Sequence, residues 1–160
     1  MRFVLYMALA GIILVVDQGT KQIAYQSLLG QPPVDVLPIL QFVLVFNKGA
    51  AFGFLSDQGG WQVYLFSGLA ILVAIGIPIW IWKICHFNTT LSLGLALVLG
   101  GALGNLIDRL QYQYVIDFIS VYYNNWYFPA FNVADIAISL GAFCLILDAI
   151  FPASEQTATE

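Results

Sequence analysis

The sequence predicts a mainly α-helical membrane protein, with four transmembrane helices and a small β element at the membrane surface. The mean hydropathy is +0.88, and 61% of the 160 residues are hydrophobic. Only 9% of the residues are Asp, Glu, Lys or Arg, whereas soluble domains carry about 25%. This composition is typical of a chain that lies in lipid, and its length suits a single domain, 1–160.

The apolar segments fit the thickness of a bilayer, which a helix of about 20 residues crosses. Residues 63–82 give 20 residues without a charge, with Pro78 near their end. The first apolar segment ends before Asp17 and reaches full length only if the helix continues through Lys21. The predicted helices span about 3–23, 63–82, 91–108 and 133–151, and a polar tail, 152–160, follows them.

The start of the chain also resembles a signal peptide, because Arg2 precedes an apolar run that contains Ala8-Leu9-Ala10. This cleavage-like triplet follows only seven residues, and apolar sequence continues past it. An uncleaved first helix is therefore the better interpretation.

The positive charges leave the orientation in the membrane open. With four spans, Arg2 and Lys83 fall on one side, whereas the other three cations fall on the opposite side. Positive charge normally favours the cytoplasmic side, so the count is nearly tied and leans against a cytoplasmic N-terminus. The three cations on the second side lie in motif-like surroundings. Because they are candidate site residues, they carry little weight in the charge count: Lys21, Lys48 and Arg109.

Two segments outside the spans, about 25–60 and 110–131, predict short strands. In the first, Val34–Phe46 and Ala50–Leu55 are apolar runs on either side of the turn signal Asn47-Lys48-Gly49. Such a pattern is typical of a small hairpin or sheet, here on the membrane surface.

In the second segment, Val115–Tyr123 and Trp126–Phe131 flank Asn124-Asn125, which predicts another hairpin. Aromatic residues crowd its loop, as is typical where a chain lies at the level of the lipid headgroups. They are Tyr122, Tyr123, Trp126 and Tyr127.

Two carboxylates in apolar surroundings, Asp117 and Asp135, are the strongest candidates for a site. Asp117 lies within Val115–Ile119 and Asp135 within Phe131–Ile136. An ionisable group beside hydrocarbon is costly and usually serves a function. Two carboxyl groups that share one proton can hydrolyse a peptide bond, because the ionised group takes a proton from water while the neutral group polarises the carbonyl.

The surroundings predict different protonation of the two groups. Asp135 lies near a predicted helix start, which favours its ionised form, whereas desolvation and its partner's charge favour a neutral Asp117. Each also has a structural interpretation. Asn132 and Asp135 would form a capping box, and Asp117 would be a paired structural carboxylate. The capping box does not explain Asp117, so a shared site is the better hypothesis.

Other polar residues cluster at helix ends. Asp17 and Lys21, four residues apart, share a helix face and form either an ion pair or a clamp for a substrate head group or a neighbouring loop. The spacing of Gly100 and Gly104 allows close approach of another helix. A single polar face near the end of that helix either caps it or shapes a site, and its members are Asn105, Asp108 and Arg109.

Other functions fit less well. His86 is the only histidine, so neither a catalytic metal nor another cofactor is expected. Cys85 and His86 are sequence neighbours, which is poor geometry for a nucleophile and its base, and Cys144 is expected to pack in the core. Ser56 and Lys48 have little local support as a dyad. The net charge of −4, without a basic run, argues against nucleic acid as a partner.

Five segments together resemble one family, the lipoprotein signal peptidases (type II signal peptidases) of bacteria. They occur in the family's order and run from residue 17 to 135, and the full set is far more specific than any one of them. Lys48 stands where many members carry Thr or another small polar residue, a difference that we expect to be tolerated. The segments are Asp17–Lys21, Phe46–Gly53, Gly100–Arg109, Val115–Phe118 and Phe131–Asp135.

The resemblance implies a membrane aspartic endopeptidase of the bacterial inner membrane, with an extracytoplasmic β element. It would cut prolipoproteins before the lipobox cysteine, once that cysteine carries a diacylglyceryl group. Both termini would lie in the cytoplasm, with the active site near the outer leaflet. Asp117 and Asp135 match the catalytic pair. Positions that match residues supporting the site or binding substrate are Asp17, Lys21, Asn47, Gly104, Asn105, Asp108, Arg109 and Asn132.

The expected partners are these precursors and membrane lipid, and we expect a monomer. The competing hypothesis is a small proton-coupled carrier or a channel subunit, because buried Asp residues also serve transport. The positions of the polar residues argue against transport. They gather near helix ends, and the only polar side chains within residues 63–82 are those of Tyr64 and Ser67.

Overall fold

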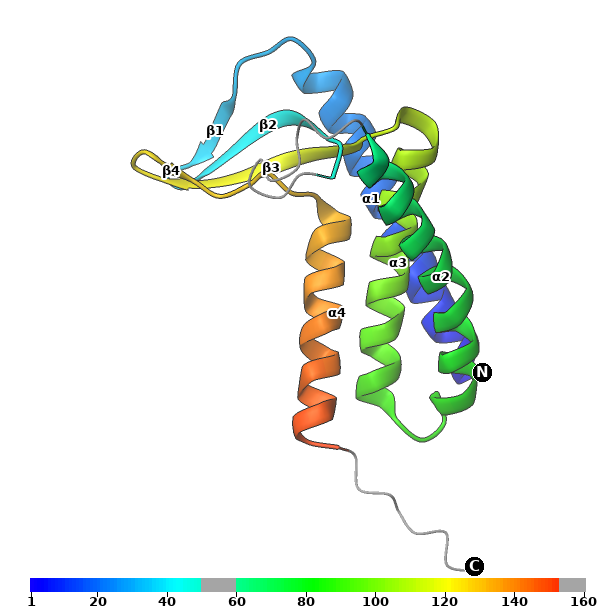
Figure 1. Cartoon of the computed structure of the whole chain (residues 1–160). Coiled ribbons are helices and arrows are strands. Elements are labelled where there is room, and N and C mark those ends of the chain that lie inside the picture. Colours follow the sequence, from blue (N-terminus) through cyan, green and yellow to red (C-terminus); the bar gives the residue numbers. More distant parts are fainter. Residues whose placement is uncertain (50–59, 153–160) are drawn as a thin grey trace, which may run out of the picture.

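The computed structural model describes residues 1–49 and 60–152, which form four long helices and a four-stranded antiparallel sheet at one end of the helices (Figure 1). All four helices are long and apolar enough to cross a membrane, which confirms the predicted fold class. The helices are α1 (Arg2–Leu28), α2 (Trp61–Ile84), α3 (Thr89–Tyr112) and α4 (Val133–Ile150).

In α1, the charged pair Asp17 and Lys21 lies on the same face as two small residues. The buried residues of this helix are Ala10, Asp17, Lys21 and Ala24, a spacing that places them along one side of a helix. The helix packs against α3. It therefore continues through both charges to Leu28, because they point into protein rather than into lipid.

The central helix is α3, which packs against α1, α2 and α4 and is the most buried of the four. Glycines allow its close approach to α4, since a Cβ at Gly141 would lie 2.7 Å from both the carbonyl oxygen of Gly94 and Cγ2 of Val98. Far from the sheet, Asn88 caps the start of α3 and donates a 2.7 Å hydrogen bond to Asp148 of α4.

The sheet joins two chain segments that are far apart in the sequence. Its order is β1-β2-β3-β4, and β2 pairs with β3 so that Val45 lies opposite Asp117 and Asn47 opposite Val115. This register brings the end of β2 next to the first candidate carboxylate. The strands are β1 (Val34–Leu37), β2 (Leu40–Asn47), β3 (Val115–Tyr123) and β4 (Trp126–Tyr127).

The first segment contains a hairpin turn that was not expected. Val34–Phe46, expected as one apolar run, is divided into β1 and β2, with Leu37 paired to Leu40. Pro38 explains the break, because proline cannot donate to a strand ladder. The expected turn at Asn47-Lys48-Gly49 is present as a local bend, in which the Gly49 N–H donates to Asn47 Oδ1 at 2.8 Å. The expected strand Ala50–Leu55 lies outside the described residues.

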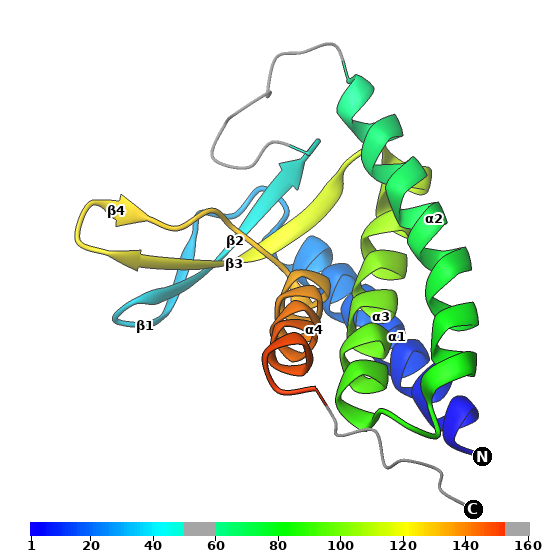
Figure 2. The same cartoon turned by 60° about the horizontal axis from the view of Figure 1, so that its bottom comes forward.

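The second hairpin agrees with the prediction, although β4 is shorter than expected. β3 pairs with Trp126 and Tyr127, and beyond them a single bridge joins Ile119 to Phe131. Figure 2 shows that the sheet reaches out to one side of the helices. The chain start, the α2–α3 turn and the end of α4 all lie at the opposite end of the molecule (Figure 1).

Replacing Gly141 by Ala should lower the melting temperature, because the added Cβ would collide with the backbone of α3. We expect the free energy of unfolding to fall by about 1–3 kcal/mol, as for other overpacked interiors. Gly76→Ala is the matched control, since Gly76 is exposed on α2 with nothing within 4 Å of an added Cβ. Both changes improve helix propensity by about 1 kcal/mol. Equal melting temperatures in detergent would contradict the close packing of α3 and α4.

Candidate active site

The fold brings Asp117 of β3 and Asp135 of α4 to either side of one asparagine. Asn132 Nδ2 donates a 2.6 Å hydrogen bond to Asp117 Oδ1. The backbone N–H of Asn132 donates to Asp135 Oδ2 at 3.2 Å. Both carboxyl groups therefore contact the same residue, and Asp117 is only 1% exposed.

Local structure explains this meeting. After β4 the chain returns to β3, where the Ile119 N–H donates to the Phe131 carbonyl at 2.9 Å. Asn132 follows directly and caps α4, with Asn132 Oδ1 accepting from the Asp135 N–H at 3.0 Å. The predicted capping box is thus present, and it also positions a candidate catalytic carboxylate. The structural and the functional interpretations of Asn132 and Asp135 are compatible.

Each of the four carboxyl oxygens accepts a hydrogen bond from an amide. Asn47 Nδ2 donates to Asp117 Oδ2 at 2.9 Å, and Asn105 Nδ2 donates to Asp135 Oδ1 at 2.8 Å. Asn132 supplies the other two. The four donors come from the end of β2, from α3 and from the start of α4, so three separate segments fix the pair.

Burial, together with the charge of Asp135, raises the pKa of Asp117 from 3.8 to about 7. Hydrogen bonds from Asn47 and Asn132 and the charge of Lys21 act in the opposite direction, but burial outweighs them. Asp117 therefore holds a proton at a pH where an ordinary aspartate is ionised. This direction agrees with the expectation from the apolar residues that flank it.

A second polar cluster lies behind the pair and has Lys21 at its centre. The Lys21 ammonium lies 2.8 Å from Asp17 Oδ2 and 3.0 Å from Asp108 Oδ2. It also donates to Asn105 Oδ1 at 2.9 Å. Lys21 is only 2% exposed, which argues against contact with a substrate head group, and the expected ion pair with Asp17 is present.

The two acids of this cluster hold neighbouring segments. Asp17 Oδ1 accepts from the Ala134 N–H at the start of α4, at 2.9 Å. Asp108 Oδ2 accepts from the Ile116 N–H at the start of β3, at 3.0 Å. Gly104 makes room for the cluster, because a Cβ there would collide with Asp17 Oδ2.

One residue of this cluster was missed as a candidate. Gln18 Nε2 donates to Asp108 Oδ1 at 2.8 Å and to the Gly104 carbonyl at 3.1 Å. Its position between Asp17 and Lys21 in the first motif was the available signal.

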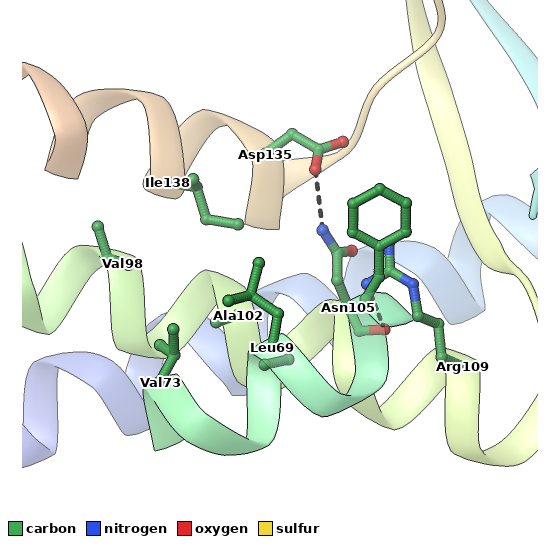
Figure 3. A pocket seen from close by; sticks show the side chains of 10 residues that line it. Leu69, Val73, Val98, Ala102, Asn105, Arg109, Asp135 and Ile138 are labelled. Carbon is green, nitrogen blue, oxygen red and sulfur yellow. Dashed lines mark hydrogen bonds between the residues drawn. The ribbon is translucent and has the colours of Figure 1, made fainter. Parts of the chain in front are cut away.

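The expected polar face of α3 is divided, because Asp108 contacts α1 whereas Asn105 and Arg109 both line a pocket. Asp108 points to α1, whereas the Arg109 guanidinium lies 5.3 Å from the ring centroid of Phe66 on α2. Arg109 also lines a pocket of about 340 Å³ between α2, α3 and α4. Asn105 and Asp135 lie at the same end of the pocket, and apolar side chains line the rest (Figure 3). The labelled apolar residues are Leu69, Val73, Val98, Ala102 and Ile138.

Chemically, the arrangement can hold one proton between two carboxyl groups beside an apolar pocket. The structure brings together Asp117, Asp135, Asn47, Asn105 and Asn132, and it places the Lys21 cluster behind them. Arg109 lies at the pocket edge. The sequence did not indicate Phe66 or the pocket, because both depend on how α2 packs.

Comparison with known proteins adds to this geometry. The chain matches the family model described as signal peptidase (SPase) II over residues 9–151. A lipoprotein signal peptidase of Acinetobacter baumannii is 50% identical over 92% of this chain and 84% of that protein. One of Coxiella burnetii is 41% identical over 91% of this chain and 89% of that protein. A solved structure described as a bacterial membrane enzyme has a TM-score of 0.78 at 28% identity, covering 97% of this chain and 93% of that one.

Asp117→Asn should flatten the pH dependence of stability. Because the pKa of Asp117 is about 7 in the folded state and about 3.9 in an unfolded chain, the folded state binds more protons between these values. The free energy of unfolding of the wild type should therefore fall as pH rises through this range.

The variant has no proton to lose at this position, so its melting temperature should fall less between pH 4 and 7. Asp35→Asn, which changes an exposed carboxylate on β1, is the control and should keep the wild-type slope. Parallel curves for the wild type and Asp117→Asn would argue against a buried proton on Asp117.

Proposed function

The chain belongs to the signal peptidase II family, and we propose that it removes the signal peptide from diacylglyceryl-modified prolipoproteins by cleaving before the lipidated cysteine. The observation that carries the proposal is the pair Asp117 and Asp135, joined through Asn132 at the sheet end of the helices. This is an aspartic mechanism, in which a water molecule rather than a protein side chain attacks the peptide bond.

The two carboxyl groups have different tasks in this mechanism. Ionised Asp135 takes a proton from water, and the resulting hydroxide attacks the carbonyl carbon of the scissile bond. Neutral Asp117 donates its proton to the carbonyl oxygen, so that a neutral tetrahedral intermediate forms. When the intermediate collapses, Asp117 recovers its proton and Asp135 gives its proton to the leaving nitrogen. Turnover then requires a protonated Asp117 and declines as pH rises through its pKa of about 7.

The pocket beside Asp135 supports an apolar substrate. It is about 340 Å³ in volume, and most of its lining is aliphatic. We propose that it accommodates the apolar part of the precursor next to the scissile bond. A lipidated precursor arrives with its acyl chains in the bilayer. A site at the end of the membrane-spanning helices can therefore reach the peptide bond next to the lipidated cysteine.

The distribution of exposed charge supports cytoplasmic termini and an active site toward the outer face. Lys21 is buried in ion pairs with Asp17 and Asp108, and the Arg109 guanidinium packs over the Phe66 ring. Of the five Lys and Arg residues of the chain, this leaves Arg2 and Lys83 exposed at the end with the chain start, against Lys48 at the sheet end. Positive charge is enriched on the cytoplasmic side, so the exposed charges favour this orientation, although the plain count of all five cations leaned against it.

Asp117→Asn and Asp135→Asn should each lower the cleavage rate of a diacylglyceryl-modified precursor by more than about 10²-fold, the usual contribution of acid–base catalysis. Asp35→Asn is the matched control and should cleave at the wild-type rate. The assay uses purified protein in detergent, with an unlipidated twin of the precursor as a second substrate. Full activity of either site variant, or equal cleavage of both substrates by the wild type, would contradict the proposal.

Ala70→Leu should narrow the pocket and raise KM for the lipidated precursor. A misfit of one or more methylene groups in an apolar pocket costs about 1–3 kcal/mol, so we expect an increase of about 10-fold or more. Ala8→Leu, at an exposed position of α1, controls for the change in side-chain size. If both variants kept the wild-type KM, the pocket would have no role in substrate binding.

A further inference from the structure

We propose that Lys21 is a positioning residue, whose ammonium group fixes the orientation of the Asn105 carboxamide and thereby makes Asn105 a hydrogen-bond donor to Asp135. This inference rests on the proposed function, because it assigns a role within the same site. Lys21 itself touches no substrate, since it is buried beneath the pair. Its influence on the reaction is therefore indirect, and Asn105 is the group that connects it to Asp135.

The hydrogen-bond chemistry of lysine dictates the orientation. An ammonium group has three N–H donors and no acceptor. Lys21 uses them on Asp17 Oδ2, Asp108 Oδ2 and Asn105 Oδ1, at 2.8, 3.0 and 2.9 Å. Asn105 therefore turns its oxygen to Lys21 and its nitrogen to Asp135, where the hydrogen bond is 2.8 Å long (Figure 3).

The reversed amide would be unfavourable at both ends. Its NH₂ group would face the ammonium of Lys21, and its oxygen would face the carboxylate of Asp135. Both contacts would place like partial charges together and leave buried donors or acceptors unsatisfied. Asn105 alone has no such preference, because its two ends are nearly equal in shape. Lys21 and Asp135 thus favour the same orientation from opposite ends, and Lys21 fixes the end that carries the oxygen.

The effect extends to the second carboxyl group. Asn105 Oδ1 also accepts from Asn132 Nδ2 at 3.3 Å, and Asn132 Nδ2 donates to Asp117 Oδ1 at 2.6 Å. A reversed Asn105 would present a donor to Asn132 in place of an acceptor. Lys21 therefore supports the donors of both Asp135 and Asp117.

The charges around the pair give this role a pH signature. Lys21 and Asp17 lie on α1, Asp108 and Arg109 on α3, Asp117 on β3 and Asp135 on α4; β2 contributes neutral Asn47. Arg109 interacts electrostatically with Asp117 and Asp135. The charge of Lys21 lowers the pKa of Asp117. Without Lys21, the pKa of Asp117 should rise further above about 7.

The test replaces the ion pair with neutral side chains of similar shape. In Lys21→Met/Asp17→Asn the cluster keeps its net charge, and Asp108 keeps the Ile116 N–H and Gln18 Nε2 as hydrogen-bond donors. We expect kcat for the lipidated precursor to fall at least 10-fold, KM to change less than about twofold, and the alkaline limb of the pH profile to move to higher pH. Lys83→Met, an exposed lysine at the opposite end, should leave all three unchanged.

A double-mutant cycle separates positioning from a structural role. Added to Asn105→Ala, the Lys21→Met/Asp17→Asn change should cost no more than about a further twofold in kcat, because the group that it orients is already absent. An equal loss of kcat with and without Asn105 would overturn the proposal, and so would an unmoved pH profile.

A second measurement uses the wild-type protein, so that the proposal stays testable if the triple change prevents folding. In protein labelled with ¹⁵N at Asn, the side-chain N–H signals that Asn105→Ala removes should shift with pH as activity is lost. Signals that do not respond to this titration would overturn the role of Asn105 as donor. Absence of cleavage by the wild type would instead count against the proposed function.

Discussion

The buried ammonium group of Lys21 fixes the positions of the two segments that carry the carboxylates, the start of α4 and the start of β3. Lys21 pairs with Asp17 and Asp108. Through these acids it is connected to the first turn of α4 and to the start of β3, because Asp17 accepts from the Ala134 N–H and Asp108 from the Ile116 N–H. Each of these backbone groups is adjacent in the chain to a carboxylate of the pair. The positions of Asp117 and Asp135 therefore follow from one ionic cluster.

Such a cluster is stable beside lipid only because every charge has partners. Burying an ion costs several kcal/mol unless charges and hydrogen bonds compensate it, and Lys21 has three acceptors in place. Gly104 is also required for this cluster, since a larger residue would leave no space for Asp17. Polar groups in membranes are tolerated where they face protein. Here the protein places them at the end of the bundle, where a peptide bond near the membrane surface can reach them.

Much of this structure could be predicted from local patterns. Hydropathy identifies four spans, the residues around Asn124 indicate a hairpin, and Asn132 with Asp135 predicts the capping box. What could not be predicted depends on packing between distant segments. The side of α3 on which Arg109 points is set by α2, and the burial of Lys21 is set by α1 lying against α3. Pro38 could have indicated the turn between β1 and β2, but the apolar residues on both sides of it suggested one continuous run.

The proposed mechanism depends on a single proton, which the pair holds on Asp117 near neutral pH. Infrared difference spectra of the purified protein would test it directly, because a protonated carboxyl group has a carbonyl stretch that a carboxylate lacks. A single proton on Asp117 should give one such band, which disappears as pH rises through about 7 and is absent from Asp117→Asn. A band that persists in this variant, or a wild-type spectrum without a band that titrates in this range, would contradict it.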